Sequence, residues 1–439
     1  MLLKEIYTNF RINTFMKYNK NIRTFLLFIL ISFAWSCGDS LWKGQETIKE
    51  VETNTLPVQH QLKGIFDLGN GLFCSNDFDG ARMNGIVLTD DTLITVLITP
   101  ENTPINSSPW YSFKIWSETK QNLFLKLTYL EGVRHRYYPK LSYDGINWQS
   151  IDSANFINGL IEEKKNSRKL PNSLTTKLTF GPDTLWVSAQ ELITSKHVDN
   201  WMKGLATKPF VSMDEIGKSL EGRPLDMLKI GTSNDQKMII VLSRQHPPEV
   251  SGYLAMQAFV ETICDETEIA KKFRDEFNTY VIPIANPDGV DNGHWRHNSG
   301  GVDLNRDWGK FNQPETSAIK VFMHDKVETT KGKFYFGVDF HSTWEDIYYT
   351  LDPKLKGNMP GLVTDMINSM SLDLPDPEPN IQPRPNDARI SSLTYFYYEF
   401  GAEPLVFEIG DETPRNYIKR KGEIAALKLM ELMTNEGNH

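Results

Sequence analysis

The chain has 439 residues, of which 40% are hydrophobic and 23% charged, and its formal net charge is −9 at pH 7. This length and composition predict a globular protein with room for two domains, and they exclude a disordered chain. The acidic balance argues against a general nucleic-acid-binding protein, because such proteins need a surplus of Lys and Arg to displace counterions from phosphates. We therefore expect no nucleic-acid partner.

Residues 1–37 have the features of a targeting segment. Basic residues precede an apolar run over 25–34, which is too short to span a bilayer as a helix but suits the core of a signal peptide. Small residues and Cys37 follow, as in a bacterial lipoprotein cleavage site. We expect export, a lipid on Cys37 and anchoring to a membrane of the cell envelope. An uncleaved N-terminal anchor, and a start at Met16 instead of Met1, are the alternatives.

The next part of the chain changes from a linker to a β-rich pattern. Residues 38–60 are polar and lack periodicity, as in a tether. Between 61 and 190, short alternating apolar runs are separated by turn-rich pieces, which is the spacing of an all-β sandwich. The predicted strands cover residues 85–88, 92–98, 110–116, 123–127 and 184–188.

Residues 193–436 show the pattern of an α/β domain. Continuous apolar runs, typical of strands covered on both faces, alternate with segments of helical spacing, so we expect a sheet with its site at the carboxyl ends of strands. The predicted strands cover 238–243, 280–284, 334–340 and 404–407, and the clearest helices 249–264 and 424–433. Cys74 and Cys264 lie in different predicted domains, and their pairing stays open at this point.

Three residues have the spacing of a catalytic metal site. His246 and Glu249 follow directly on the first buried strand, and His341 ends another. Two close ligands and one distant ligand leave the fourth position of a zinc ion open, as a catalytic site requires. Asp303 and Asp339 are candidates for the carboxylates that orient the imidazoles.

One acidic residue interrupts the last buried strand. Glu408 lies inside the apolar run 405–410, where a carboxylate is costly unless it is paired, lies beside a metal or transfers protons. A general base next to metal-bound water explains such a residue. A glutamate at the edge of the core, held by backbone amides, is an equally weighted alternative.

A long Gly- and Asn-rich segment, 285–308, is too irregular for a helix or strand, and long loops in compact domains are usually functional. Arg306 with Asn305 has the donors to clamp a terminal carboxylate. Arg296 has the charge to stabilise an oxyanion formed when water attacks a carbonyl.

Taken together and in order, these motifs resemble the zinc carboxypeptidase family, and within it the cytosolic-carboxypeptidase-like branch. The set is His246-Pro-Pro-Glu249, Asn286-Pro-Asp-Gly289, Arg296, Asp303-Leu-Asn305-Arg306, His341 and Glu408.

The resemblance implies a mixed, eight-stranded α/β sheet covered by helices and preceded by an all-β sandwich. It implies one zinc ion per chain, bound by His246, Glu249 and His341. By the same resemblance, Arg296 stabilises the oxyanion, and Glu408 acts first as base and then as acid.

On the substrate side, the resemblance assigns the terminal carboxylate to Asn305 and Arg306. The family often places a tyrosine over the substrate, and Tyr395 is our choice among three neighbouring tyrosines. Arg389 occupies a stretch similar to one where deglutamylase relatives carry a specificity arginine.

The predicted activity is hydrolysis of the C-terminal peptide bond of peptides. Two alternatives remain at this stage. One is a zinc-dependent amidohydrolase or deacylase on the same scaffold, and the other is a non-catalytic binding lipoprotein of the cell surface.

Overall fold

The computed structural model describes residues 48–164, 167–375, 378–384 and 390–435. The predicted lipid site Cys37 and the predicted specificity residue Arg389 lie outside these residues. Within them, no helix combines the length and the apolar composition needed to cross a bilayer.

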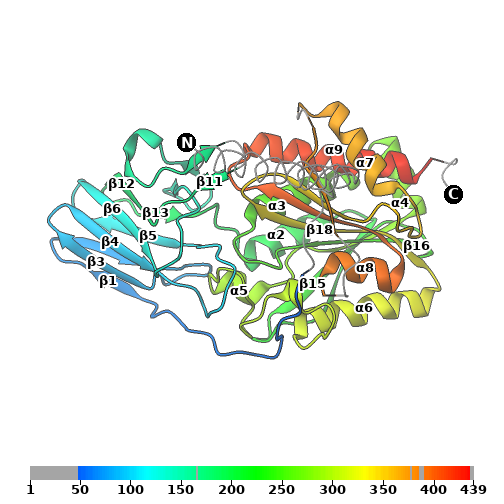
Figure 1. The fold of residues 1–439 in the computed structure, drawn as a ribbon, viewed down its shortest axis with the longest axis horizontal. Helices are drawn as coiled ribbons and strands as arrows, with labels where there is room; N and C mark the ends of the chain where they lie inside the picture. The colour runs from blue at the N-terminus through cyan, green and yellow to red at the C-terminus, as the bar shows by residue number, and fades with distance from the viewer. Residues whose placement is uncertain (1–47, 165–166, 376–377, 385–389, 436–439) are drawn as a thin grey trace, which may run out of the picture. The chain divides into compact units, whose positions relative to one another are not determined.

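Two sheets form the first part of the described chain (Figure 1). The first has the strand order β1 (Ile65–Asp67), β2 (Leu72–Ser75), β5 (Ser112–Ser117), β13 (Leu185–Ser188), β7 (Lys140–Ser142) and β8 (Gln149–Ser150). The second has the order β3 (Gly85–Asp90), β4 (Leu93–Ile98), β6 (Gln121–Tyr129), β12 (Ser173–Phe180) and β9 (Phe156–Asn158). A small hairpin joins β10 (Glu162–Lys164) to β11 (Ser167–Lys169), and a 3-10 turn covers Ser153–Asn155.

These two sheets share one hydrophobic core, as a sandwich requires. Alternate residues of β4 and β6, such as Ile94 and Leu125, are fully buried against Phe113 and Ile115 of β5 in the other sheet. The predicted β-sandwich is therefore confirmed. Cys74 belongs to this core, whereas Cys264 belongs to the core of the second part, and both are free thiols.

The second part of the chain forms a mixed eight-stranded sheet, which confirms the predicted fold class. Its order is β14 (Val211–Lys218), β15 (Pro224–Ile230), β17 (Asn278–Ile282), β16 (Lys237–Ser243), β18 (Lys333–Thr343), β21 (Glu403–Gly410), β19 (Ile347–Leu351) and β20 (Ile381–Arg384). The central strands β17, β16, β18 and β21 run parallel to one another.

Helices cover both faces of this sheet (Figure 1). Ile239 and Val241 of β16 pack into the cluster that contains α3, α7 and α9, whereas Ile240 and Leu242 pack into the cluster with α6 and α8. This alternation explains why the strand is apolar throughout. The helices are α2 (Ser195–Leu205), α3 (Val250–Ile263), α4 (Glu268–Glu276), α5 (Pro287–Asp291), α6 (Pro314–Thr330), α7 (Leu362–Asp373), α8 (Ser392–Phe400) and α9 (Arg415–Met433), with a 3-10 turn over Leu304–Arg306.

Candidate active site

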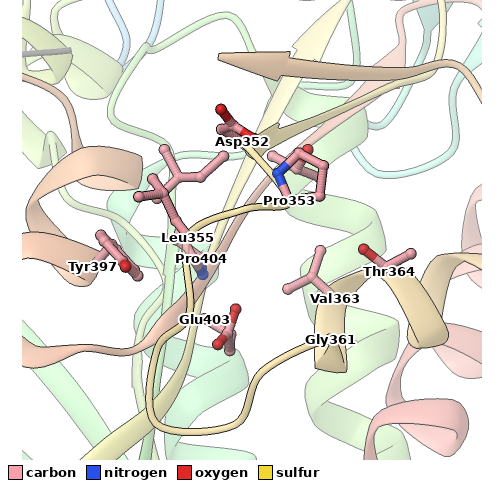
Figure 2. A pocket seen from close by; sticks show the side chains of 11 residues that line it. Asp352, Pro353, Leu355, Gly361, Val363, Thr364, Tyr397, Glu403 and Pro404 are labelled. Carbon is pink, nitrogen blue, oxygen red and sulfur yellow. The ribbon is translucent and has the colours of Figure 1, made fainter. Parts of the chain in front are cut away.

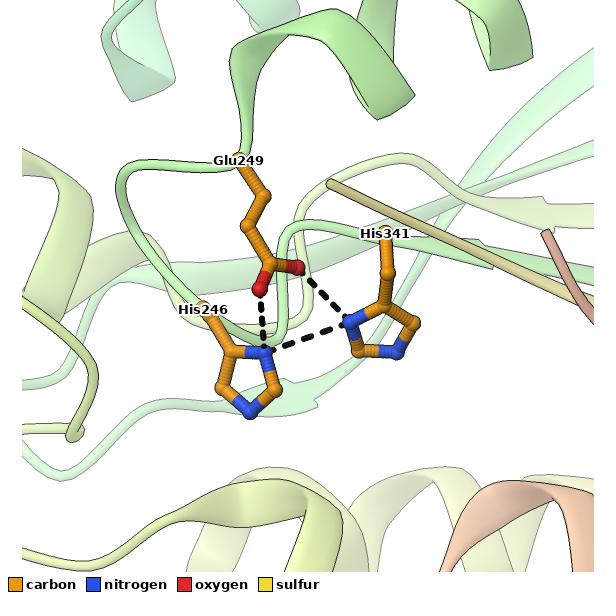
Figure 3. A group of neighbouring side chains, drawn as sticks. All are labelled: His246, Glu249 and His341. Carbon is orange, nitrogen blue, oxygen red and sulfur yellow. Dashed lines mark hydrogen bonds and ion pairs between the residues drawn. The ribbon is translucent and has the colours of Figure 1, made fainter. Parts of the chain in front are cut away.

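Three potential metal ligands converge at the carboxyl ends of the parallel strands. One ligand atom from each of His246, Glu249 and His341 lies within 4.8 Å of the others, and all three side chains are buried. Nδ1 of His246 is 2.8 Å from one oxygen of Glu249, Nδ1 of His341 is 2.7 Å from the other, and the two Nδ1 atoms are 3.2 Å apart. Figure 3 shows both imidazole rings turned toward the same carboxylate.

A tight turn after β16 directs the first two ligands. The strand ends at Ser243, and Arg244 then adopts a left-handed backbone conformation with φ of 53°. Asn286 holds the turn from outside, because its backbone N–H donates to the carbonyl of Arg244 at 3.2 Å and its side-chain amide to that of Gln245 at 3.1 Å. The Asn-Pro-Asp-Gly motif thus supports the turn that carries His246.

A glycine lets the second and third ligands approach each other. Gly252, in the first turn of α3, lies so close to β18 that an added Cβ atom would sit 2.3 Å from the carbonyl oxygen of His341. Any larger residue would therefore displace the helix that follows Glu249. The backbone N–H of Gly252 also donates to the Ser342 hydroxyl at 2.8 Å, which fixes the helix on the strand.

Two aspartates orient the imidazoles so that they suit a cation. Nε2 of His246 lies 2.9 Å from Asp303, and Nε2 of His341 lies 2.8 Å from Asp339. A carboxylate accepts a hydrogen bond from the ring nitrogen that faces it, so the neutral tautomer of each ring carries its proton on Nε2 and its lone pair on Nδ1. Both lone pairs then face the Glu249 carboxylate. Two imidazole nitrogens and one carboxylate form a donor set that a divalent cation such as zinc prefers.

The charge of Glu249 suits the same role. Burial by itself raises the pKa of Glu249, but positive charge on the imidazoles of His246 and His341 outweighs burial and holds this pKa below its usual value, and a bound cation would supply the same positive charge. Its carboxylate is therefore ionised at neutral pH. Two nitrogen lone pairs and one negative carboxylate that face a single point need a positive charge between them, so the residues fit a bound metal ion.

Glu408 lies next to this triad because of strand register. His341 of β18 and Glu408 of β21 are direct partners in parallel pairing, so their side chains emerge on the same side of the sheet. Burial and the nearby Glu249 carboxylate raise the pKa of Glu408 to about 7. Its Oε2 atom is buried without a hydrogen-bond partner in the described part of the chain. An uncommitted carboxylate with this pKa is suited to accept and return protons.

Arg296 is fixed by the same aspartate that orients His246. Its Nε atom donates to Oδ2 of Asp303 at 2.6 Å, while Oδ1 of Asp303 faces His246. The backbone N–H of Asn305 also donates to Oδ1 of Asp303, at 2.9 Å. The Asp303 carboxylate therefore contacts a metal ligand, His246, as well as the predicted oxyanion residue Arg296 and the backbone of Asn305 in the predicted clamp.

The predicted clamp residues lie beside the triad. The amide nitrogen of Asn305 is 3.4 Å from Nε2 of His341, and its oxygen accepts a hydrogen bond from the backbone of Ser392 at 3.1 Å. The half-buried Arg306 forms no ion pair with any carboxylate of the described residues, and its guanidinium donates to the carbonyl of Asn305 at 2.8 Å. A guanidinium in this state is available to an anionic ligand.

A cavity of about 240 Å³ joins these residues and includes side chains that the sequence did not single out. Arg136, from the β-sandwich part, is held by Asp411 at 2.8 Å and by the Ser108 hydroxyl at 2.8 Å. Tyr349 of β19 and Arg384 of β20, the last two strands in the sheet order, also line the cavity, and the guanidinium of Arg384 lies 5.1 Å from the ring centre of Tyr349. No local motif identifies these residues, because only tertiary contacts bring them to the cavity.

The structure does not bring Tyr395 to this cavity. Its side chain is only 2% exposed and packs against the rings of Trp308 and Phe311, at 5.4 and 5.0 Å between ring centres. Its hydroxyl lies 3.1 Å from Nε2 of His324. Tyr395 faces the hydrophobic cluster under α6 and α8, because the helical turn of α8 directs position 395 inward. Among the described residues, Tyr349 is the tyrosine that lines the cavity.

A second, smaller cavity lies at the other end of β21 (Figure 2). Its lining includes Glu403, which accepts a hydrogen bond from the backbone N–H of Gly357 at 2.8 Å. Burial raises the pKa of Glu403 to about 7, as for Glu408 on the same strand. Glu403 has no potential metal ligand set around it in the described residues, so a raised pKa alone does not mark the active site.

This site defines a class of metal-dependent hydrolases, and the comparisons with known proteins specify the family. Residues 198–399 match the model of the zinc carboxypeptidase family. The α/β domain of this chain belongs to that family, whose members depend on zinc.

Several relatives support this assignment. An uncharacterised protein of Zymomonas mobilis is 26% identical over an alignment of 272 residues that covers 60% of this chain and 64% of that protein. Cytosolic carboxypeptidase 3 of Bos taurus is 23% identical over an alignment of 298 residues that covers 62% of this chain and 29% of that protein. The chain thus spans less than two thirds of the length of either relative.

A solved structure shares the fold over most of the chain. A candidate carboxypeptidase A from Shewanella denitrificans superposes with a TM-score of 0.68 and 20% identity, covering 82% of this chain and 98% of that one. The shared region is longer than the α/β domain alone, so it includes part of the β-rich region.

Proposed function

We propose that this protein is a zinc-dependent carboxypeptidase that removes the C-terminal residue of peptides. The observation that carries the proposal is the convergence in one cavity of a His-Glu-His triad, a glutamate with a free carboxylate oxygen and a guanidinium that forms no ion pair with the described residues. Each group alone has a structural explanation. Their common location matches the needs of peptide-bond hydrolysis at a free carboxyl terminus.

The residues of this chain divide the reaction between them. A zinc ion held by the triad, one per chain, supplies Lewis acidity toward a carbonyl oxygen and lowers the pKa of water. Glu408 takes the proton of the attacking water and returns it to the leaving amine. The guanidinium of Arg296 donates hydrogen bonds to the oxyanion that develops on the scissile carbonyl.

Arg306 and Asn305 explain why the enzyme would act only at a chain end. A planar guanidinium binds a carboxylate through two parallel hydrogen bonds, which a peptide amide in the middle of a chain does not offer. Arg306 and the triad line the same cavity, so we expect a terminal carboxylate bound by Arg306 to place the last peptide bond of the substrate beside the metal ion.

Replacing Arg306 with alanine tests this role and the proposed function together. We expect kcat/KM for a peptide with a free C-terminus to fall by about 10²-fold, because a charge-assisted bidentate contact is lost. Wild-type protein is expected to cleave the free peptide and to leave the same peptide with an amidated C-terminus intact. Mass spectrometry of both peptides, with N-acyl amino acids as a further substrate set, measures this.

The outcomes separate the candidate activities. Equal cleavage of free and amidated peptides would contradict a terminal-carboxylate clamp. Preferential hydrolysis of N-acyl amino acids would favour a deacylase on the same scaffold. Absence of any hydrolysis by zinc-loaded protein would favour a binding lipoprotein.

We further propose that the protein is exported and anchored through a lipid on Cys37. The support is the sequence pattern alone, a basic and apolar leader followed by small residues and a cysteine. Metabolic labelling with a radioactive fatty acid tests it. Label on wild-type protein and none on a Cys37→Ser variant is the expected result, and labelling of both would contradict it.

A further inference from the structure

The loop that carries Arg296 is attached to the β-sandwich through one buried carboxylate. Glu101 follows β4 of the sandwich and has no solvent exposure. One of its oxygens accepts the backbone N–H of Trp295 at 2.8 Å, and the other accepts those of Arg296 at 3.0 Å and His297 at 2.7 Å. Three consecutive amides, nearly two hundred residues away in the chain, therefore point at one side chain.

Neighbouring contacts strengthen the same attachment. Asn102 lies 2.6 Å from Nδ1 of His297 and donates to the carbonyl of Gly301 at 3.0 Å. Trp295 is fully buried in the sandwich core, where its indole N–H donates to the carbonyl of Trp110 at 3.1 Å. The residues on each side of Arg296 are thus held by the β-sandwich.

The side chain of Arg296 has different partners from its anchored backbone. Its guanidinium lines the active-site cavity and is held by Asp303, which also orients His246. Backbone and side chain of Arg296 are therefore fixed by two different carboxylates, Glu101 from the sandwich and Asp303 from the catalytic domain.

The charge of Glu101 favours a strong anchor. An ionised carboxylate without water is costly unless hydrogen bonds and positive charges compensate it. Here burial alone would raise the pKa of Glu101, but His294, Arg82 and His297, with the amide of Trp295, hold it below its usual value. The side chain is ionised, and bonds from amides to an ionised acceptor are about twice as strong as neutral ones.

We propose that Glu101 is a positioning residue for Arg296, so that the β-sandwich supplies a required part of the oxyanion site. The proposal rests on the proposed carboxypeptidase function. An oxyanion donor acts only if it is held where the negative charge develops, and a displacement of about 1 Å can reduce the rate by roughly 10²-fold. Glu101 does not touch the substrate and acts through the backbone of Arg296.

A double-mutant cycle in the full-length, zinc-loaded protein tests the proposal. Glu101→Gln keeps the size of the side chain but turns an amide group toward one of the three N–H donors. We expect it to lower kcat by about 10- to 100-fold with little change in KM or zinc content. In an Arg296→Ala background the same change is expected to cost less than about twofold, because the residue it positions is gone. An equal cost in both backgrounds would overturn the proposal.

Glu191→Gln is the matched control. Glu191 also links the two parts of the chain, through a bidentate ion pair with Arg415 at 2.8 Å, but does not contact the Arg296 loop. We expect this variant to keep its kcat. A loss equal to that of Glu101→Gln would show that general docking of the sandwich matters and would overturn a specific role for Glu101.

Hydrogen exchange provides a readout that does not depend on activity. In Glu101→Gln, and in Glu101→Ala if it folds, the amides of residues 295–297 are expected to exchange at least about tenfold faster, while the rest of the protein is unchanged. Unchanged exchange at these amides, or faster exchange throughout, would overturn the proposal. If wild-type protein cleaves no peptide, the proposed function fails, whereas this measurement still decides whether Glu101 holds the loop.

Discussion

Replacing Glu408 with glutamine is expected to lower kcat for peptide hydrolysis by about 10³-fold, because a positioned general base contributes roughly 10²- to 10⁴-fold. Glutamine keeps the shape of the side chain but does not accept a proton from water at neutral pH. KM and zinc content are expected to change little, since Glu408 is outside the ligand triad. Steady-state kinetics and metal analysis of the purified variant measure all three quantities.

Glu403 offers a matched control on the same strand. Its pKa is also raised to about 7, but it lies at the start of β21, five residues before Glu408 (408 − 403 = 5). Five residues of extended strand span roughly 17 Å, so Glu403 does not reach the metal centre. We expect Glu403→Gln to retain full kcat. Retained activity in Glu408→Gln, or a comparable loss in both variants, would contradict the assignment of the base.

The pH profile should identify the same residue. Glu408 must be ionised to accept a proton, so kcat/KM is expected to fall as the pH decreases through its pKa, which burial and the Glu249 carboxylate raise to about 7. The acid limb is therefore expected at or below pH 7, because the charge of a bound cation favours the ionised carboxylate. Measurement between pH 4.5 and 9 checks this, and an identical limb in the residual activity of Glu408→Gln would exclude Glu408 as its origin.

Loss of the metal is the second change with a large expected effect. Dialysis against a chelator is expected to abolish hydrolysis, and one equivalent of zinc per chain is expected to restore it. His341→Ala is expected to prevent restoration, because two remaining ligands do not hold a catalytic zinc ion at micromolar concentration. The midpoint of thermal unfolding should rise when zinc is added to the stripped wild type, since the ion binds only the folded site.

Asp339, which orients the His341 ring, permits a milder change to the same metal centre. Asp339→Asn is expected to weaken zinc binding by about 10- to 100-fold, because the carboxylate that fixes the ring tautomer is lost. His324→Ala serves as the control, since His324 belongs neither to the triad nor to the lining of the cavity and contacts Tyr395. Undiminished zinc affinity in both His341→Ala and Asp339→Asn would contradict the proposed centre.

Local features of the sequence were sufficient for much of the fold. The runs at 238–243 and 334–340 correspond to β16 and β18, and the helical spacing after Glu249 corresponds to α3. A central strand is buried on both sides and a covering helix on one face, so a short stretch of sequence shows their apolar pattern. The outer strands β14, β15, β19 and β20, two at each end of the sheet, were not predicted from the residues, because the ends of the sheet are more exposed to water and the apolar pattern of these strands is weaker.

The sequence alone also identified the chemical groups of the site. Each has a local pattern: a His-Glu pair after a strand, a His at the end of another strand and an acidic residue in an apolar run. Tertiary structure alone decided how these groups meet. The pairing of His341 with Glu408 depends on the register of two strands. Arg136 reaches the cavity from the β-sandwich, Glu101 of the β-sandwich holds the backbone of Arg296, and Tyr395 turns into the core. These outcomes follow from packing and hydrogen bonding between segments far apart in the chain, which no short stretch of sequence encodes.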